Sequence, residues 1–97
     1  MNLSQMRNLK KVISKMLVES GVKRAALFGS FARGDATEDS DIDLLIEFKS
    51  KTKSLFDLVE LKIQLEEKLG RHVDLLTYNS LHPLLRDRIL AEQVIIL

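Results

Sequence analysis

Hydrophobic residues recur along this chain at two spacings, and each spacing predicts its own kind of element. Over Ser4–Ser20 and Ser54–Leu69 they return every three to four residues, which is the spacing of a helix with one apolar side. We expect one more helix within Ser80–Ala91. Pro83 does not exclude it, since it falls in the first turn, where a proline is tolerated. The pattern therefore predicts a helix near each end of the chain and one in the middle.

Shorter apolar stretches between these helices predict strands. Val22–Phe28 is a short apolar run, and His72–Tyr78 and Asp41–Phe48 place apolar residues at every second position. Val94–Leu97 is apolar and suits an edge strand. With 97 residues, we expect these elements to form a single domain over residues 1–97.

The strand predicted over Asp41–Phe48 carries the first sign of chemistry. Its even-numbered residues are all apolar and share one face, so Asp41 and Asp43 share the other, about 6–7 Å apart. We expect the two carboxylates at the buried start of the strand, where like charges repel unless a cation lies between them. Mg²⁺ suits this position, because it binds carboxylate oxygens and keeps positions for substrate phosphates.

The turn ahead of this strand offers a contact for phosphates. Gly29 permits a sharp change of direction, and Ser30 can cap the helical turn that we expect over Ser30–Arg33. A strand that leads through a glycine into a helix start exposes free N–H groups, which bind anions. A Gly-Ser pair taken alone is better explained by a tight connection with a capping serine, since the pair is common.

A third carboxylate lies in the strand predicted over His72–Tyr78. Asp74 points away from the apolar face of that strand, and an acid there is unfavourable unless it is paired or bound to metal. Asp74 is therefore the natural third ligand, and a salt bridge to Arg71 or Arg24 is the alternative. His72 is next to this site, but one histidine without a cysteine or second histidine makes a poor zinc site.

The Ser54–Leu69 helix is apolar over a wider sector than one sheet face needs. One stripe consists of leucines, and a second stripe beside it contains Phe56, Val59 and Ile63. The helix is either wedged between the sheet and another helix, or it docks a partner protein with its second stripe. The pattern leaves both interpretations open.

Composition excludes several classes of protein. A net charge of +1 and 5% aromatic residues argue against stable nucleic-acid binding. The absence of cysteine excludes disulfides and thiolate metal sites. No apolar run has the length of a membrane span, and Met1–Ser20 lacks the apolar core of a signal peptide, so we expect a cytoplasmic protein with no membrane contact.

Together these motifs resemble a known signature. The chain contains Gly29-Ser30, then ten intervening residues, then Asp41-Ile42-Asp43. This arrangement resembles the Gly-Ser-X10-Asp-X-Asp motif of the DNA polymerase β-like nucleotidyltransferase superfamily. With Ala32-Arg33-Gly34, and at this size, the chain resembles the minimal nucleotidyltransferases (MNT), typically the antitoxins of HEPN/MNT toxin–antitoxin modules. The resemblance implies an α/β (α+β) fold, a mixed β-sheet packed by helices, that binds ATP and Mg²⁺, with two ions expected.

The resemblance also implies an activity and its residues. In that family, AMP from ATP is transferred to a tyrosine hydroxyl of the HEPN toxin, which is thereby inactivated. The motif residues carried over to this sequence are Asp41, Asp43 and Asp74 as catalytic metal ligands, and Gly29, Ser30 and Arg33 as nucleotide contacts. Arg33 either faces phosphate or pairs with the acids of the following loop.

Rival functions stay open at this point. A non-catalytic antitoxin would mask the toxin by binding alone, but a silent site has no physical reason to keep three unpaired acids. A nucleotidyltransferase acting on a small molecule, such as an aminoglycoside, would need an acceptor pocket that only a dimer could supply in so short a chain. A polymerase or RNA-tailing enzyme is disfavoured by the low net charge. Whether the protein forms a homo-oligomer is left open.

Overall fold

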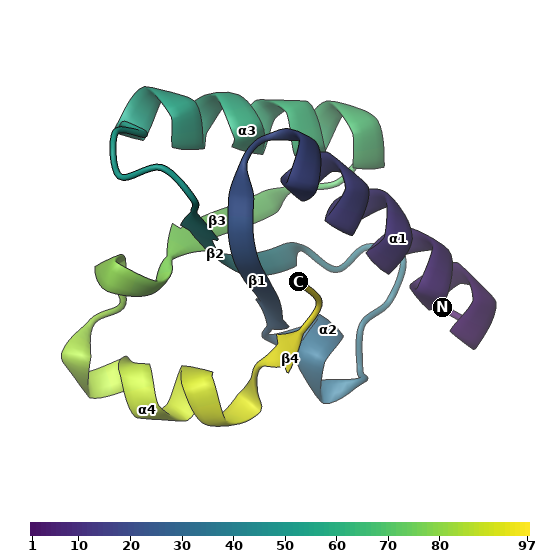
Figure 1. Ribbon diagram of the computed structural model, residues 1–97. Helices are drawn as coiled ribbons and strands as arrows, with labels where there is room; N and C mark the ends of the chain where they lie inside the picture. Colours follow the sequence, from purple (N-terminus) through teal and green to yellow (C-terminus); the bar gives the residue numbers. More distant parts are fainter.

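The computed structural model describes all residues from 1 to 97, which form one four-stranded sheet and the helices around it (Figure 1). The elements in chain order are α1 (Leu3–Glu19), β1 (Val22–Phe28), α2 (Ser30–Arg33), β2 (Ile42–Phe48), α3 (Leu55–Leu69), β3 (Val73–Thr77), the 3₁₀ turn η1 (Tyr78–Ser80), α4 (Pro83–Glu92) and β4 (Val94–Ile95). Every helix and strand that the sequence predicts is present, with ends shifted by a few residues at most.

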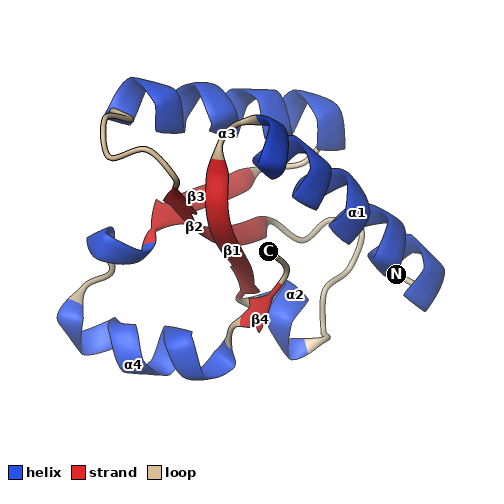
Figure 2. Cartoon of the chain, viewed as in Figure 1, coloured by secondary structure: helices blue, strands red, loops and turns tan.

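The sheet is mixed, as the predicted α/β (α+β) class requires. Its strand order is β3-β2-β1-β4, with β1 antiparallel to both β2 and β4, and with β2 parallel to β3 (Figure 2). A parallel pair needs a crossover connection, and α3 provides it between β2 and β3. Because β2 and β3 run in the same direction, the first residues of both strands meet at one end of the sheet.

The main core lies between the sheet and the two long helices, α1 and α3. The predicted apolar row of β2 faces this core, with Ile42, Leu44 and Ile46 fully buried. The helices meet that row with their own fully buried residues, such as Leu17 of α1 and Leu65 of α3. Each such side chain contributes about 1.5–3 kcal/mol through burial, so this layer holds the sheet in place.

The opposite face of the sheet is covered only in part. Leu45, Tyr78 and Leu81 form a small second cluster there, under η1 and α4. Leu45 is the central residue of β2, so this cover does not reach the beginning of that strand. The first residues of β2 and β3 thus keep polar side chains accessible on this face.

Local sequence explains how α3 begins and ends. The N–H of Ser54 donates to Oδ2 of Asp57 at 2.7 Å, as in a capping box, and this hydrogen bond lowers the pKa of Asp57. Gly70 follows the helix with φ of 64°, in the left-handed region that favours glycine. The capping box and Gly70 therefore account for both ends of α3.

The second apolar stripe of α3 is exposed. Phe56 is 86% accessible, and Val59 and Ile63 are also accessible, whereas Leu61 and Leu65 are buried. The interpretation that another helix of this chain covers the second stripe is wrong, because α1 packs only beside the leucine stripe that faces the sheet. Docking of a partner on the second stripe stays a prediction. None of the helices combines the length and the apolar character that a membrane span requires.

Candidate functional site

The structure brings the three predicted carboxylates together at one end of the sheet. Asp43 of β2 and Asp74 of β3 are direct partners in the parallel ladder, and Asp41 immediately precedes β2. Oxygen atoms of Asp41 and Asp74 lie within 4.8 Å of each other, and a nitrogen of His72 lies within the same distance of both. A single cation could therefore contact groups from both strands.

The cluster is more exposed than the sequence analysis expects. The side chains of Asp41 and Asp74 are 58% and 51% accessible, and only Asp43 is partly buried. The expectation of two carboxylates at a buried strand start is therefore wrong for Asp41. The physical reason is that the strand begins one residue later, at Ile42, and that η1 and α4 cover the sheet only farther along.

Asp43 is the carboxyl group whose environment is most unfavourable to charge. The pKa of Asp43 is raised to about 6, first by burial and then by the hydrogen bond and negative charge of Asp74 and by the charge of Asp41. The Arg33 guanidinium acts in the opposite direction and lowers the pKa of Asp43. A cation bound between the carboxylates would stabilise all three in the ionised form.

Gly29 approaches Asp43 so closely that a larger residue at this position would displace the Asp43 carboxylate. A Cβ atom on Gly29 would lie 2.2 Å from Oδ2 of Asp43, and the backbone of Gly29 has φ of 68° and ψ of −146°. Few residues other than glycine adopt this conformation. The glycine is thus required both by the turn and by the carboxylate beside it.

The turn itself differs from its prediction in one detail. Gly29 is the N-cap residue of α2 and Ser30 is the first helical residue, so the expectation that Ser30 is the N-cap is wrong. The carbonyl of Gly29 accepts hydrogen bonds from the N–H groups of Ala32 and Arg33, at 3.1 and 3.0 Å. These bonds form the single turn of α2 and leave Ser30 at its start, next to Gly29.

Arg33 ends α2 and pairs with a loop acid. Its Nε lies 3.4 Å from Oδ2 of Asp35, and both side chains are more than half exposed. Of the two alternatives for Arg33, the structure shows the ion pair, while its charge also acts on Asp43. A phosphate contact by Arg33 stays a prediction.

No arginine pairs with Asp74, so the salt-bridge alternative for Asp74 is wrong. Arg24 pairs with Glu47, at 2.6 Å between Nε and Oε1. Arg71 instead holds the loop that leads to Asp41, because its Nη1 donates to the carbonyls of Thr37 and Ser40, at 3.1 Å each. Local sequence gives no signal for this role, because the carbonyls that Arg71 binds are more than thirty positions away.

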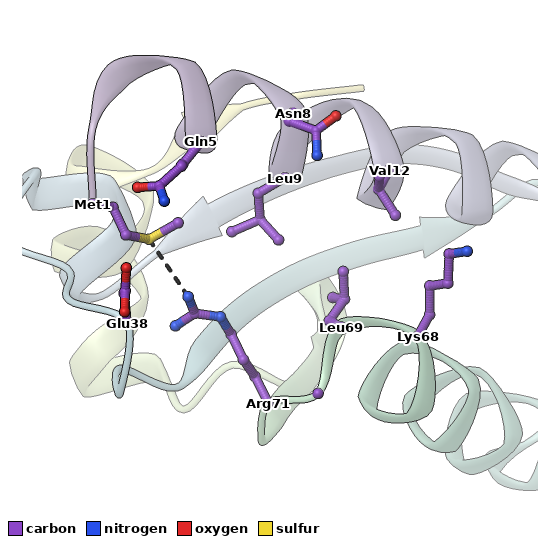
Figure 3. A pocket seen from close by; sticks show the side chains of 10 residues that line it. Met1, Gln5, Asn8, Leu9, Val12, Glu38, Lys68, Leu69 and Arg71 are labelled. Carbon is purple, nitrogen blue, oxygen red and sulfur yellow. Dashed lines mark hydrogen bonds between the residues drawn. The ribbon is translucent and has the colours of Figure 1, made fainter.

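Arg71 also borders a hollow of about 490 Å³ on another part of the molecule. In Figure 3 its side chain reaches across that hollow to Met1, with Nη2 3.6 Å from the sulfur atom. Residues of α1 and the end of α3 line the hollow, and none of the six predicted site residues does. The carboxylate cluster is therefore a separate site on an open part of the surface.

Comparison with known proteins decides the family. The family described as "Nucleotidyltransferase domain" matches residues 6–96. The chain belongs to this family. The nucleotidyltransferase is 56% identical over 97 residues to MJ0435 of Methanocaldococcus jannaschii, provisionally named a protein adenylyltransferase, and the match covers all of both chains. It is 42% identical over 74 residues to protein adenylyltransferase MntA of Thermococcus cleftensis, which covers 76% of this chain and 74% of that one.

Solved structures share the fold of this nucleotidyltransferase. One provisionally described as a minimal nucleotidyltransferase has a TM-score of 0.80 and 38% identity, covering 97% of this chain and 95% of that one. A toxin–antitoxin structure with AMP-PNP has a TM-score of 0.78 at 24% identity, and the match covers 91% of this chain and 72% of that one. Another match is the structure of a tri-AMPylated Shewanella oneidensis HEPN toxin in complex with MNT antitoxin, with a TM-score of 0.75 at 21% identity. It covers 95% of this chain and 71% of that one. The resemblance to minimal nucleotidyltransferases is confirmed.

Proposed function

We propose that this nucleotidyltransferase is an antitoxin that transfers AMP from ATP to a tyrosine hydroxyl of a HEPN-family toxin and so inactivates it. The observation that carries the proposal is the convergence of Asp41, Asp43 and Asp74 beside the turn at Gly29. The names of its relatives as protein adenylyltransferases support AMP transfer, and the fold shared with an MNT antitoxin bound to a HEPN toxin supports the partner.

The donor set of the cluster fits the predicted Mg²⁺. Three carboxyl groups lie together, and burial and the charges of Asp74 and Asp41 disfavour the ionised form of Asp43 when no cation is bound. We assign Asp41, Asp43 and Asp74 as the residues that hold Mg²⁺, with two ions expected. When bound, the cations neutralise charge on the triphosphate and on the leaving pyrophosphate.

The chain's own residues place the nucleotide. Gly29 has no side chain, so we expect a triphosphate to approach the turn beside Asp43 and the Ser30 hydroxyl, at the start of α2, to donate to one of its oxygens. The guanidinium of Arg33 is near enough to influence Asp43 and, by turning from Asp35, could contact a phosphate. These contacts orient ATP with its α-phosphate toward the carboxylates.

The transfer step then requires a base for the acceptor. The tyrosine oxygen forms a bond to the α-phosphorus, and the bond from that phosphorus to the bridging oxygen breaks, so that pyrophosphate leaves. The tyrosine proton passes to the carboxylate of Asp74, which is half exposed and accessible to a partner protein. The products are the tyrosine–AMP ester and pyrophosphate.

One observation favours a second candidate, the non-catalytic antitoxin. The exposed stripe of Phe56, Val59 and Ile63 offers a contact surface, which such a protein would use to mask the toxin without chemistry. The small-molecule acceptor, the homo-oligomer and the cytoplasmic location stay predictions.

The deciding experiment is intact-mass spectrometry of a HEPN toxin incubated with this protein, ATP and Mg²⁺. We expect the toxin to gain mass in whole AMP units with the natural protein and none with the Asp41→Ala, Asp43→Ala double variant. A matched control, Glu38→Ala with Asp39→Ala, removes two exposed acids of the preceding loop and should keep the activity. A stable complex without any mass gain would instead establish masking by binding.

A further inference from the structure

His72 lies beside the three carboxylates of the cluster. The parallel ladder pairs Ile42 with Val73 and Asp43 with Asp74, so the residues just before these pairs, Asp41 and His72, lie side by side. The Ile42 N–H donates to the carbonyl of His72 at 3.0 Å and fixes this register. Because side chains alternate along a strand, His72 shares its face with Asp74.

The imidazole of His72 faces both exposed carboxylates. Its Nδ1 lies 3.8 Å from Oδ2 of Asp41 and 3.8 Å from Oδ1 of Asp74. Around an octahedral cation with bonds of about 2.1–2.2 Å, neighbouring donor atoms lie about 3 Å apart and opposite ones about 4.3 Å apart. Both distances from Nδ1 fall between these two values, so side-chain rotations that change them by less than about 1 Å would bring the three donor atoms onto one cation.

A carboxylate on the far side of the ring supports this arrangement. Nε2 of His72 lies 3.9 Å from Oε2 of Glu66, which is held in place because it accepts the Val73 N–H at 3.0 Å. This distance is longer than a hydrogen bond, and it places the Glu66 carboxylate beside the ring nitrogen that does not face Asp41 and Asp74. Metal-binding histidines typically have a carboxylate at their other nitrogen, which orients the ring and increases its basicity.

We propose that His72 is a further ligand of the cation and that it makes the site bind Mn²⁺ in preference to Mg²⁺. The proposal rests on the proposed function, in which Asp41 and Asp74 hold a cation. Mg²⁺ takes oxygen ligands almost exclusively, whereas first-row transition cations gain affinity from an imidazole nitrogen. Mn²⁺ also accepts carboxylates in octahedral geometry, so it matches a mixed set of Asp41, Asp74 and His72.

Electron spin-echo envelope modulation of Mn²⁺ bound to the full chain, without nucleotide, tests the ligand directly. We expect the ¹⁴N modulation of a coordinated imidazole in the natural protein and none in His72→Asn. His82 is the only other histidine and caps α4 by accepting the Leu84 N–H at 3.2 Å. His82→Asn, which can keep that cap, should retain the signal.

Calorimetric titration with each cation tests the preference. His72→Asn should weaken Mn²⁺ binding about tenfold or more and change Mg²⁺ binding less than about twofold. Absence of the ¹⁴N signal, absence of Mn²⁺ binding by the natural protein, or equal weakening for both cations would overturn the proposal. The proposed function fails separately, through absence of AMP on the toxin with Mg²⁺ and with Mn²⁺.

Discussion

Replacement of Gly29 by alanine tests whether the close approach of the turn to Asp43 is essential to the site. The new Cβ would lie 2.2 Å from Oδ2 of Asp43, well inside van der Waals contact, so the carboxylate must rotate away. The substitution therefore moves a proposed metal ligand without removing any polar atom. Gly70→Ala is the matched control, because Gly70 also has a positive φ, of 64°, but no heavy atom within 4 Å of its Cβ position.

The magnitudes follow from the backbone and the clash. At Gly29 the conformation is nearly restricted to glycine and costs alanine about 1–3 kcal/mol. Rotation of Asp43 from its staggered position adds about 0.5–1.5 kcal/mol, for a total of about 1.5–4.5 kcal/mol. Gly70→Ala carries only the left-handed backbone penalty of about 1–2 kcal/mol. At this chain length, each 1 kcal/mol lowers the melting temperature by about 4–8 °C.

Thermal melts and transfer rates separate the two effects. Both alanine variants should melt lower than the natural protein, and Gly29→Ala should melt lower than Gly70→Ala. At a temperature where all three proteins are folded, Gly70→Ala should keep its AMP transfer rate, while Gly29→Ala should lose about 100-fold, because a ligand displaced by about 1 Å has effects of this size. Equal transfer rates in the two folded variants would refute the reasoning that Gly29 positions Asp43.

Three further predictions concern the charge, the loop and the core. The raised pKa of Asp43 means that its contribution to stability is fully present below about pH 3.8 and is lost as the pH rises through about 6. Asp43→Asn should therefore raise the free energy of unfolding of the cation-free protein at about pH 7.5 and not at about pH 3.5, as measured by urea unfolding with a chelator present. An equal change in unfolding free energy at both pH values would contradict this prediction. Arg71→Ala should lower the free energy of unfolding by about 1–2 kcal/mol and weaken Mn²⁺ binding at Asp41, because the carbonyls of the loop lose their hydrogen-bond donor. Unchanged calorimetric titrations with Mn²⁺ would exclude a role of Arg71 in positioning Asp41. Leu65→Ala, in the core, should cost about 2–5 kcal/mol in the same unfolding assay, whereas Phe56→Ala, which is exposed, should change stability by less than about 0.5 kcal/mol.

The elements and the carboxylate pair could be predicted because they depend on local spacing. Alternation along a strand places Asp41 and Asp43 opposite the apolar row of β2 whatever β2 pairs with, and glycine with serine marks the turn. The exposure of Asp41 could not be predicted in this way. It depends on where η1 and α4 cover the sheet, which is a property of segments far apart in the sequence.

By itself, the sequence determined the helices, the strands, the apolar face of β2 and the acids that could bind a cation, since each depends on residues within a few positions. Only the tertiary structure decided that β2 and β3 pair in parallel with Asp43 beside Asp74, and that the same register places His72 beside Asp41. The physical reason is that side-chain direction is fixed by the local backbone, whereas strand register depends on packing between segments separated by the whole of α3.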